Sequence, residues 1–291
     1  MKPSAFSYHA PRTTAEAVGL LAELGDGAKV LAGGQSLIPL LALRLAAFDH
    51  LIDIGRIEEI KGIERHNGAL RIGAGTTEAR VGSSPEVAGA VPLLARATPL
   101  IGHFQIRNRG TLGGAIAHAD PAAEYPAVAL ALNATMEVLS PRGRRSVAAA
   151  EFFDGTWSTS LEADELLVGV TFPVWTGRCG FAVEELARRA GDFAIAGAAV
   201  AVEIDGDDRA ARCSIGLFGL GPTPERAAEA EQSVTGAALT EIVPGDLGRL
   251  AVQGLDAVPS DLHGPAEFRR RAGAAMVARA WTSAAAEASH E

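Results

Sequence analysis

The sequence predicts an α+β fold, and two observations lead to this class. Strand-like and helical segments are partly segregated along the chain, which favours α+β over a doubly wound parallel sheet. The second half contains three apolar segments that we expect to pair as an antiparallel meander, with helical segments after them. With 291 residues, of which 48% are hydrophobic and 21% are charged, the chain is long enough to bury a large core and too apolar for disorder.

The first half begins with a helix. Thr13 and Glu16 form a capping box, apolar residues then recur at helical spacing, and Gly25 ends the run. The next elements are expected to be strands at 29–32, 51–54 and 69–73 and helices at 37–45 and 92–101.

The chain is expected to form two units that meet near residue 175. The first unit ends in strands at 134–140, 145–153 and 165–173. The second unit is expected to contain the meander strands 181–187, 198–204 and 211–219, helices at 226–231 and 248–252, and a long alanine-rich helix at 265–286.

Charge and hydropathy exclude two classes of partner. The chain has 26 basic and 35 acidic residues, a formal net charge of -9, whereas binding to a nucleic-acid backbone requires the opposite sign. No segment reaches 18 charge-free apolar residues and the N-terminus has no apolar signal core, so we expect no membrane insertion and a cytoplasmic protein.

Cysteine and histidine usage argues against a metal centre. A two-iron two-sulfur cluster needs four ligands, and the chain has only Cys179 and Cys213. The seven histidines show no metal-ligand spacing. We therefore expect no metal in this chain, and any iron–sulfur chemistry must belong to another polypeptide.

The first glycine-rich loop lies between a predicted strand and a predicted helix. Gly33 and Gly34 leave the backbone accessible to a phosphate, and the hydroxyl of Ser36 stands near the start of the helix. An ordinary tight turn is the alternative, because a glycine pair alone is weak support. The candidate binding residues are Ala32, Gly33, Gly34, Gln35, Ser36 and Leu37.

A second glycine-rich loop repeats this chemistry. A hydroxyl residue precedes two glycines, against which a flat ring or a second phosphate could lie, and acidic groups that could accept hydrogen bonds from sugar hydroxyls follow. A tight turn or a β-bulge is the alternative. Neither loop has the Rossmann or P-loop pattern. The candidates here are Thr111, Leu112, Gly113, Gly114, Ala115, His118, Asp120 and Glu124.

Four stretches together resemble the FAD-binding medium subunit of the molybdenum hydroxylases, the family of carbon monoxide dehydrogenase, xanthine dehydrogenase and bacterial N-heterocycle dehydrogenases. They are AGGQSLIP from Ala32, RNRGTLGGAIAHADPAAEYP from Arg107, RRAGDFAIAG from Arg188 and SDLHGPAEFRRR from Ser260. The resemblance implies a p-cresol methylhydroxylase-type FAD-binding domain of two subdomains, 1–56 and 57–175. It also implies a C-terminal α+β domain, 176–291, with an antiparallel sheet and helices.

The resemblance also implies how FAD is held. Ala32–Ser36 and Thr111–Ala115 would bind the pyrophosphate, and Asp120 or Glu124 would bind a hydroxyl of the FAD chain. Asp192 and Phe193 occupy a GDF position whose aromatic residue would lie near the isoalloxazine. Plain core packing is the alternative for Phe193.

The implied function is electron transfer within a larger enzyme. An iron–sulfur small subunit would deliver electrons from a molybdopterin-containing large subunit, and FAD on this chain would pass them to an external acceptor, in a dimer of heterotrimers. We therefore expect no catalytic acid, base or nucleophile in this chain. Two alternatives remain: a self-contained flavin oxidoreductase, and a flavin-free scaffold subunit.

Overall fold

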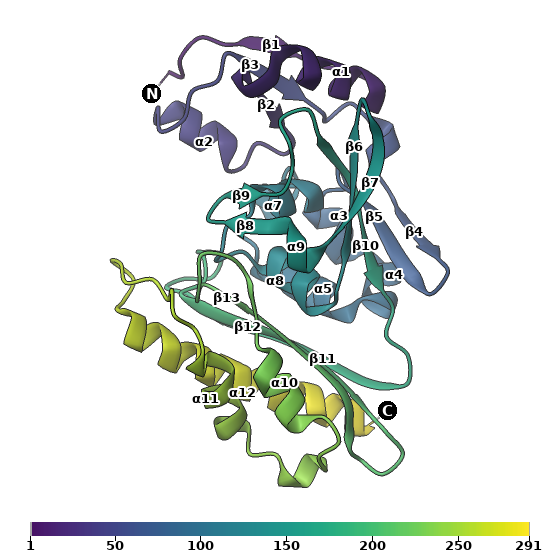
Figure 1. The fold of residues 1–291 in the computed structure, drawn as a ribbon, viewed down its shortest axis with the longest axis vertical. Helices are drawn as coiled ribbons and strands as arrows, with labels where there is room; N and C mark the ends of the chain where they lie inside the picture. The colour runs from purple at the N-terminus through teal and green to yellow at the C-terminus, as the bar shows by residue number, and fades with distance from the viewer. Residues whose placement is uncertain (1, 291) are drawn as a thin grey trace.

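The computed structural model describes residues 2–290, in which three larger sheets follow one another along the long axis of the molecule and a two-stranded hairpin forms a fourth, small sheet (Figure 1). The order is β1-β3-β2 in the first sheet, β4-β5-β10-β6-β7 in the second and β11-β12-β13-β14 in the third. The first sheet is parallel, and every pairing in the other two is antiparallel. The predicted α+β class is confirmed.

The first sheet comes from the N-terminal 53 residues. Thr13 caps the first helix by accepting a hydrogen bond from the Glu16 backbone N–H, as the capping box predicts. The elements are β1 (Ser7–His9), α1 (Thr14–Leu24), β2 (Ala28–Leu31), α2 (Leu37–Ala42) and β3 (His50–Asp53).

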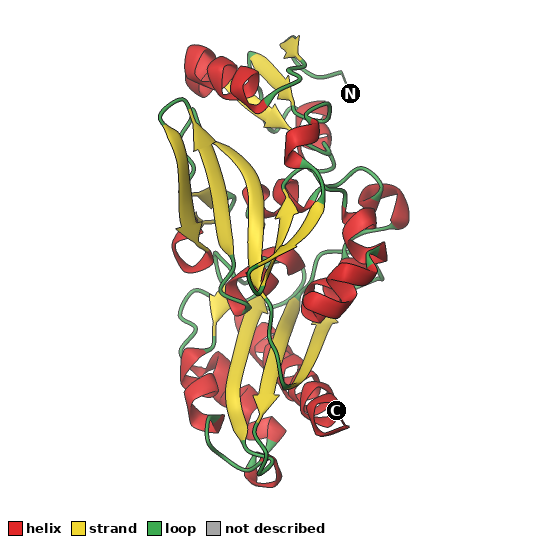
Figure 2. Cartoon of the chain, turned by 90° about the vertical axis from the view of Figure 1, so that its right-hand side faces the viewer, coloured by secondary structure: helices red, strands yellow, loops and turns green. Residues whose placement is uncertain are grey.

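Short helices pack beside the second sheet and contribute to the largest buried core (Figure 2). The strands are β4 (Ile63–His66), β5 (Ala69–Gly73), β6 (Thr135–Ser140), β7 (Gly143–Ala148) and β10 (Leu166–Pro173). The helices are α3 (Glu78–Ser83), α4 (Pro85–Ala90), α5 (Pro92–Ala97), α6 (Phe104–Arg107), α7 (Leu112–His118), α8 (Glu124–Ala131) and α9 (Ala149–Phe152). The hairpin of β8 (Phe153–Gly155) and β9 (Ser158–Thr159) stands beside α7.

The third sheet is the predicted meander. Its strands are β11 (Arg178–Leu186), β12 (Ala196–Ile204), β13 (Ala210–Phe218) and β14 (Glu225–Arg226), and its helices are α10 (Ala228–Val234), α11 (Pro244–Gln253) and α12 (Ala266–His290). The last helix packs directly on the sheet because both surfaces carry small residues: a Cβ on Gly180 would lie 1.8 Å from the Ala284 carbonyl oxygen.

Several predicted elements have different limits in the structure. The helix predicted over 92–101 ends at Ala97, where a short 3-10 helix follows, and the helix predicted over 226–231 begins at Ala228, after β14. The strand predicted over 145–153 ends at Ala148, and α9 follows; its residues Ala149 and Phe152 are buried. The strand stops there because its partner β6 begins at Thr135, which pairs with Ala148. The helix predicted over 37–45 ends at Ala42, and Arg44 has a φ of 58°, which no helix continues through.

Candidate functional site

The first glycine-rich loop joins β2 to α2 and presents unpaired backbone donors. Among residues 2–290, none of the four backbone N–H groups of Gly33, Gly34, Gln35 and Ser36 has a hydrogen-bond partner. The Gln35 side chain folds back instead, and its Nε2 donates to the Gly33 carbonyl at 2.8 Å. Gly34 has a φ of 74°, which favours glycine. Successive unpaired N–H groups of this kind form a site for an anion.

The second glycine-rich loop has its N–H groups already engaged. Thr111 caps α7, because its hydroxyl oxygen accepts from the Gly114 N–H at 3.0 Å. The N–H groups of Leu112 and Gly113 donate to the carbonyls of Thr76 and Ala74. A Cβ on Gly113 would lie 2.4 Å from the Ala74 Cβ. The fold therefore fixes the shape of this loop without a ligand.

The two loops meet. A Cβ on Gly33 would lie 2.2 Å from the Arg109 carbonyl oxygen and 2.7 Å from the Gly110 Cα, and one on Gly114 would lie 3.4 Å from the Ala32 Cβ. Residues about 75 positions apart in the sequence are thus in contact, so one ligand could touch both loops. At Gly33 the missing side chain makes room for the other loop, which the sequence alone does not reveal.

Three carboxyls with raised pKa values lie near one another, of which Glu78 and Glu124 are buried and Glu185 is half-buried. Glu124 begins α8 and is 6% exposed; burial first, then the nearby Glu185, Glu78 and Asp120, raise its pKa to about 8. Burial raises the pKa of Glu78 to about 7 against the opposing charge of Arg107, and burial raises the pKa of Glu185 to about 7. The group therefore retains protons near neutral pH.

Two of these carboxyls have unused acceptors. The Oε2 atoms of Glu78 and Glu185 are buried without a hydrogen-bond partner among the described residues. A Cβ on Gly110 would lie 2.5 Å from the Glu78 Oε2, which places this carboxyl against the second loop. The sequence does not single out Glu78, because a glutamate in the first helical turn after the capping residue Thr77 usually faces solvent.

The predicted residues Asp120 and His118 contact Trp157, which the sequence analysis did not single out. Asp120 accepts from the Ala122 N–H at 2.9 Å and from the Trp157 Nε1–H at 3.1 Å. The imidazole of His118, whose pKa is lowered by burial, stacks on the indole with an interplanar angle of 7° and centroids 6.4 Å apart. Both Asp120 oxygens thus already have partners within the chain.

The GDF segment lies between β11 and β12, and both Asp192 and Phe193 are exposed. Phe193 is 64% exposed, so the core-packing alternative for this residue is wrong. Its neighbour Gly191 packs on the loop before α6, because a Cβ there would lie 2.8 Å from the Gly102 carbonyl oxygen.

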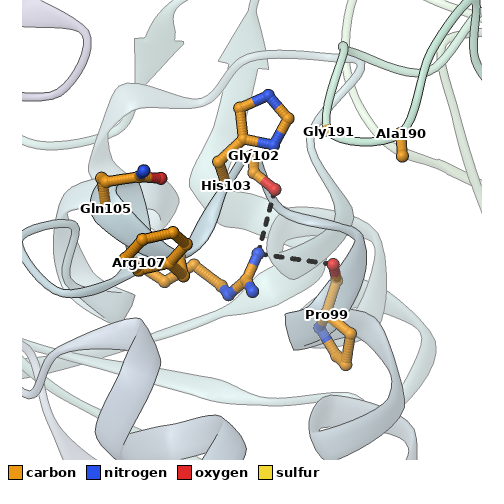
Figure 3. A pocket seen from close by; sticks show the side chains of 8 residues that line it. Pro99, Gly102, His103, Gln105, Arg107, Ala190 and Gly191 are labelled. Atoms are coloured by element: carbon orange, nitrogen blue, oxygen red, sulfur yellow. Dashed lines mark hydrogen bonds between the residues drawn. The ribbon is translucent and has the colours of Figure 1, made fainter.

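A hollow of about 450 Å³ lies where these segments meet (Figure 3). Arg107 spans its floor and donates to the carbonyls of Ile101 and Gly102 at 2.8 and 2.9 Å. The lining residues are Pro99, Gly102, His103, Phe104, Gln105, Arg107, Ala190 and Gly191. The GDF segment is thus joined to the chain that leads into the second glycine loop.

These features fit FAD. The unpaired N–H groups of the first loop suit phosphate oxygens, and the orphaned carboxyl oxygens of Glu78 and Glu185 suit the hydroxyls of a ribityl or ribose group. No three His, Cys, Asp or Glu side chains within residues 2–290 are arranged to hold a metal ion. No helix in this range is long and apolar enough to cross a membrane.

Two protein-family models match the chain. Residues 4–175 match the FAD binding domain in molybdopterin dehydrogenase, and residues 181–284 match the CO dehydrogenase flavoprotein C-terminal domain.

Individual proteins with similar sequences include the carbon monoxide dehydrogenase medium chain of Hydrogenophaga pseudoflava, which is 40% identical over 98% of each chain. The 6-hydroxypseudooxynicotine dehydrogenase complex subunit alpha of Paenarthrobacter nicotinovorans is 39% identical over 96% of this chain and 94% of its own.

Solved structures show the same fold. A chain of the Hydrogenophaga pseudoflava carbon monoxide dehydrogenase that lacks the Mo-pyranopterin moiety superposes with a TM-score of 0.95 at 42% identity, covering 99% of both chains. A chain of quinoline 2-oxidoreductase from Pseudomonas putida 86 superposes with a TM-score of 0.93 at 38% identity, again over 99% of both chains.

Proposed function

Because this chain belongs to the family of FAD-binding medium subunits of molybdenum hydroxylases, we propose that it takes electrons from a partner iron–sulfur subunit and passes them to an external acceptor. The family makes the chain an oxidoreductase subunit with FAD as its cofactor. What we propose beyond the family is the direction of electron flow and the identity of the partner subunits.

One observation supports this function above the others: the unpaired N–H groups of Gly33–Ser36 lie where the two glycine loops meet. They would hold the diphosphate, with the Ser36 hydroxyl beside them and Gly114 forming the opposite wall. Glu124, or an orphaned oxygen of the neighbouring carboxyls, would accept from a sugar hydroxyl. When bound, FAD supplies the redox chemistry, and the chain supplies position and electrostatics.

The proposal requires two partner subunits. Two cysteines cannot ligate a two-iron two-sulfur cluster, so the electron donor must be another polypeptide. The substrate would react on a molybdopterin-containing large subunit, and the three chains would assemble as a dimer of heterotrimers. The exposed GDF segment, at the hollow beside Arg107, lies on a surface that such a donor could reach.

The test uses the full chain, alone and with its partners. The purified chain should be yellow and release FAD, not FMN, on denaturation. Chemically reduced protein should pass electrons to an acceptor, while an organic substrate should reduce the flavin only after the small and large subunits are added. Direct bleaching by substrate would instead establish a self-contained oxidoreductase, and failure to bind flavin would establish a scaffold.

A further inference from the structure

Trp157 occupies a position that neither turn geometry nor burial explains. It lies at the turn of the hairpin formed by β8 and β9, and it is 64% exposed. Its φ is 58°, in the left-handed region that favours Gly, Asn or Asp at a hairpin turn. A tryptophan there costs backbone strain and gains little from burial.

The exposed indole is nevertheless held in place. Its Nε1–H donates to Asp120 at 3.1 Å, and the backbone N–H of Trp157 donates to the Ala119 carbonyl at 3.2 Å. His118 stacks on the ring, with centroids 6.4 Å apart. The hairpin itself is anchored, because the Thr156 hydroxyl donates to the Pro222 carbonyl at 3.2 Å. The ring is therefore preorganised while most of its surface stays open.

The indole lies within reach of the diphosphate site. The contact residue His118 ends α7, and the second glycine loop begins this helix, so the two are roughly 9 Å apart along the axis. Lys29, on the strand that leads into the first loop, is near enough to His118 to lower the pKa of the imidazole. The indole thus stands beside the end of α7 that is opposite the second glycine loop, and a sugar between a diphosphate and a ring could span roughly the length of this helix.

We propose that Trp157 is a stacking platform for a planar heteroaromatic ring of the bound dinucleotide, and that Asp120 is the residue that positions it. Such a ring gains from stacking on an indole whose orientation is already fixed. The inference rests on the proposed function, since it takes FAD as the ligand, and it names the two rings of FAD as the possible occupants.

The test uses tryptophan fluorescence of the flavin-free full chain. Trp175 and Trp281 are 8% and 2% exposed, so Trp157 is the indole accessible to a ligand. FAD should quench the emission of Trp157. Trp157→Phe should abolish the quenching that is due to Trp157 and should retain the affinity for FAD. Trp157→Ala should weaken FAD binding about tenfold, within the roughly 5- to 160-fold range that corresponds to base–aromatic stacking.

Two further variants separate this role from a structural one. Asp120→Ala should lower the fluorescence anisotropy of Trp157 and weaken FAD binding less than Trp157→Ala does. Val243→Ala, which shortens an exposed apolar side chain before α11, should leave FAD binding unchanged.

Quenching by ADP would assign the platform to the adenine, and quenching by FMN would assign it to the flavin ring; either supports the proposal. Two results would refute the proposal for Trp157 and leave the proposed function standing. One is that FAD stays bound on gel filtration but does not quench Trp157. The other is that Trp157→Ala binds FAD as tightly as the unaltered chain does. An unaltered chain that retains no FAD would refute the proposed function and this inference together.

Discussion

Glu78, Glu124 and Glu185 bring three carboxyls together behind a site that is proposed to hold an anion. Ionised, they would repel a diphosphate; with pKa values of about 7, 8 and 7 they hold protons near neutral pH and can donate as well as accept hydrogen bonds. Burial is the largest cause of each shift, so the fold maintains this state.

The buried carboxyls make folding stability depend on pH. Glu124 has an ordinary pKa of 4.5 and a folded value of about 8, so the folded state binds more protons between these values and stability falls as the pH rises through this window. For one carboxyl the slope approaches 1.4 kcal/mol per pH unit, to order of magnitude. Glu124→Gln should flatten the decline in Tm of the flavin-free chain.

The matched control is Glu151→Gln, an exposed carboxyl on α9, which should keep the pH dependence of the unaltered chain. Thermal unfolding between about pH 5 and pH 8.5 gives the comparison. Parallel curves for Glu124→Gln and the unaltered chain would show that Glu124 is ionised in the folded protein.

Gly33 is predicted to support the contact between the loops as well as ligand binding. In Gly33→Ala the new Cβ would collide with the Arg109 carbonyl, and backbone cannot move aside cheaply. We expect a loss of about 1–3 kcal/mol in the free energy of unfolding, together with a large loss of FAD. The control is Gly89→Ala, where no atom lies within 4 Å of the new Cβ. This variant should keep the free energy of unfolding, measured by denaturation, and the flavin content of the unaltered chain.

At the scale of elements, α12 fixes the segment that precedes β12. Arg269 on this helix is 4% exposed, and its Nη1 donates to the carbonyls of Ile195 and Gly219 at 2.6 and 3.1 Å. Its Nη2 contacts both oxygens of Asp261, at 2.8 and 2.7 Å, which lowers the pKa of Asp261. The stretch SDLHGPAEFRRR thus holds the end of the GDF segment in place.

Asp261→Asn should therefore destabilise the chain by about 1 kcal/mol, a modest figure because the carboxylate is half exposed. The contribution of an Asp with a lowered pKa is present above its ordinary value of 3.8 and is lost as the pH falls through the folded pKa. The difference in the free energy of unfolding between the unaltered chain and Asp261→Asn should thus be largest at pH 7 and become smaller in acid. Asp256→Asn, an exposed residue on the loop after α11, should have no effect; equal losses in both variants would contradict the pairing.

Local patterns predicted the elements better than the site. The capping box at Thr13 and the alanine-rich segment at 265–286 marked α1 and α12 to within a few residues, because their signals are local. Glu78 and Trp157 escaped notice because their roles depend on what lies opposite them in the fold. The same holds for Gly33, whose neighbour Gly110 is distant in sequence.

At the scale of the whole molecule, the last helix joins the third sheet to the helices around the second. Glu287 accepts from Arg96 on α5 at 2.5 Å and from the Phe181 N–H on β11 at 2.9 Å. Arg96 also donates to the Phe181 carbonyl. The Glu287 carboxylate therefore connects α5, beside the second sheet, to β11 of the third sheet. The GDF segment and the hollow lie where these two parts of the molecule meet.

Glu287→Ala should loosen this junction and lower the free energy of unfolding by about 1 kcal/mol, since a partly exposed pair is screened by solvent. Arg96 lowers the pKa of Glu287 below its ordinary 4.5, so the contribution is present above that value and lost in acid. Calorimetry at neutral pH should show a broader or split transition. Glu267→Ala, exposed on the same helix, should unfold like the unaltered chain; identical transitions in both variants would refute the role of Glu287.

The contrast between the two glycine loops has a consequence for amide hydrogen exchange. In the flavin-free chain the amides of Gly33–Ser36 have no partner and should exchange within seconds, whereas those of Leu112–Ala115 are paired within the fold and should be protected. FAD binding should then slow exchange in the first loop by orders of magnitude and change the second little. The cofactor would thus order one half of its own site, while the other half is built before it arrives.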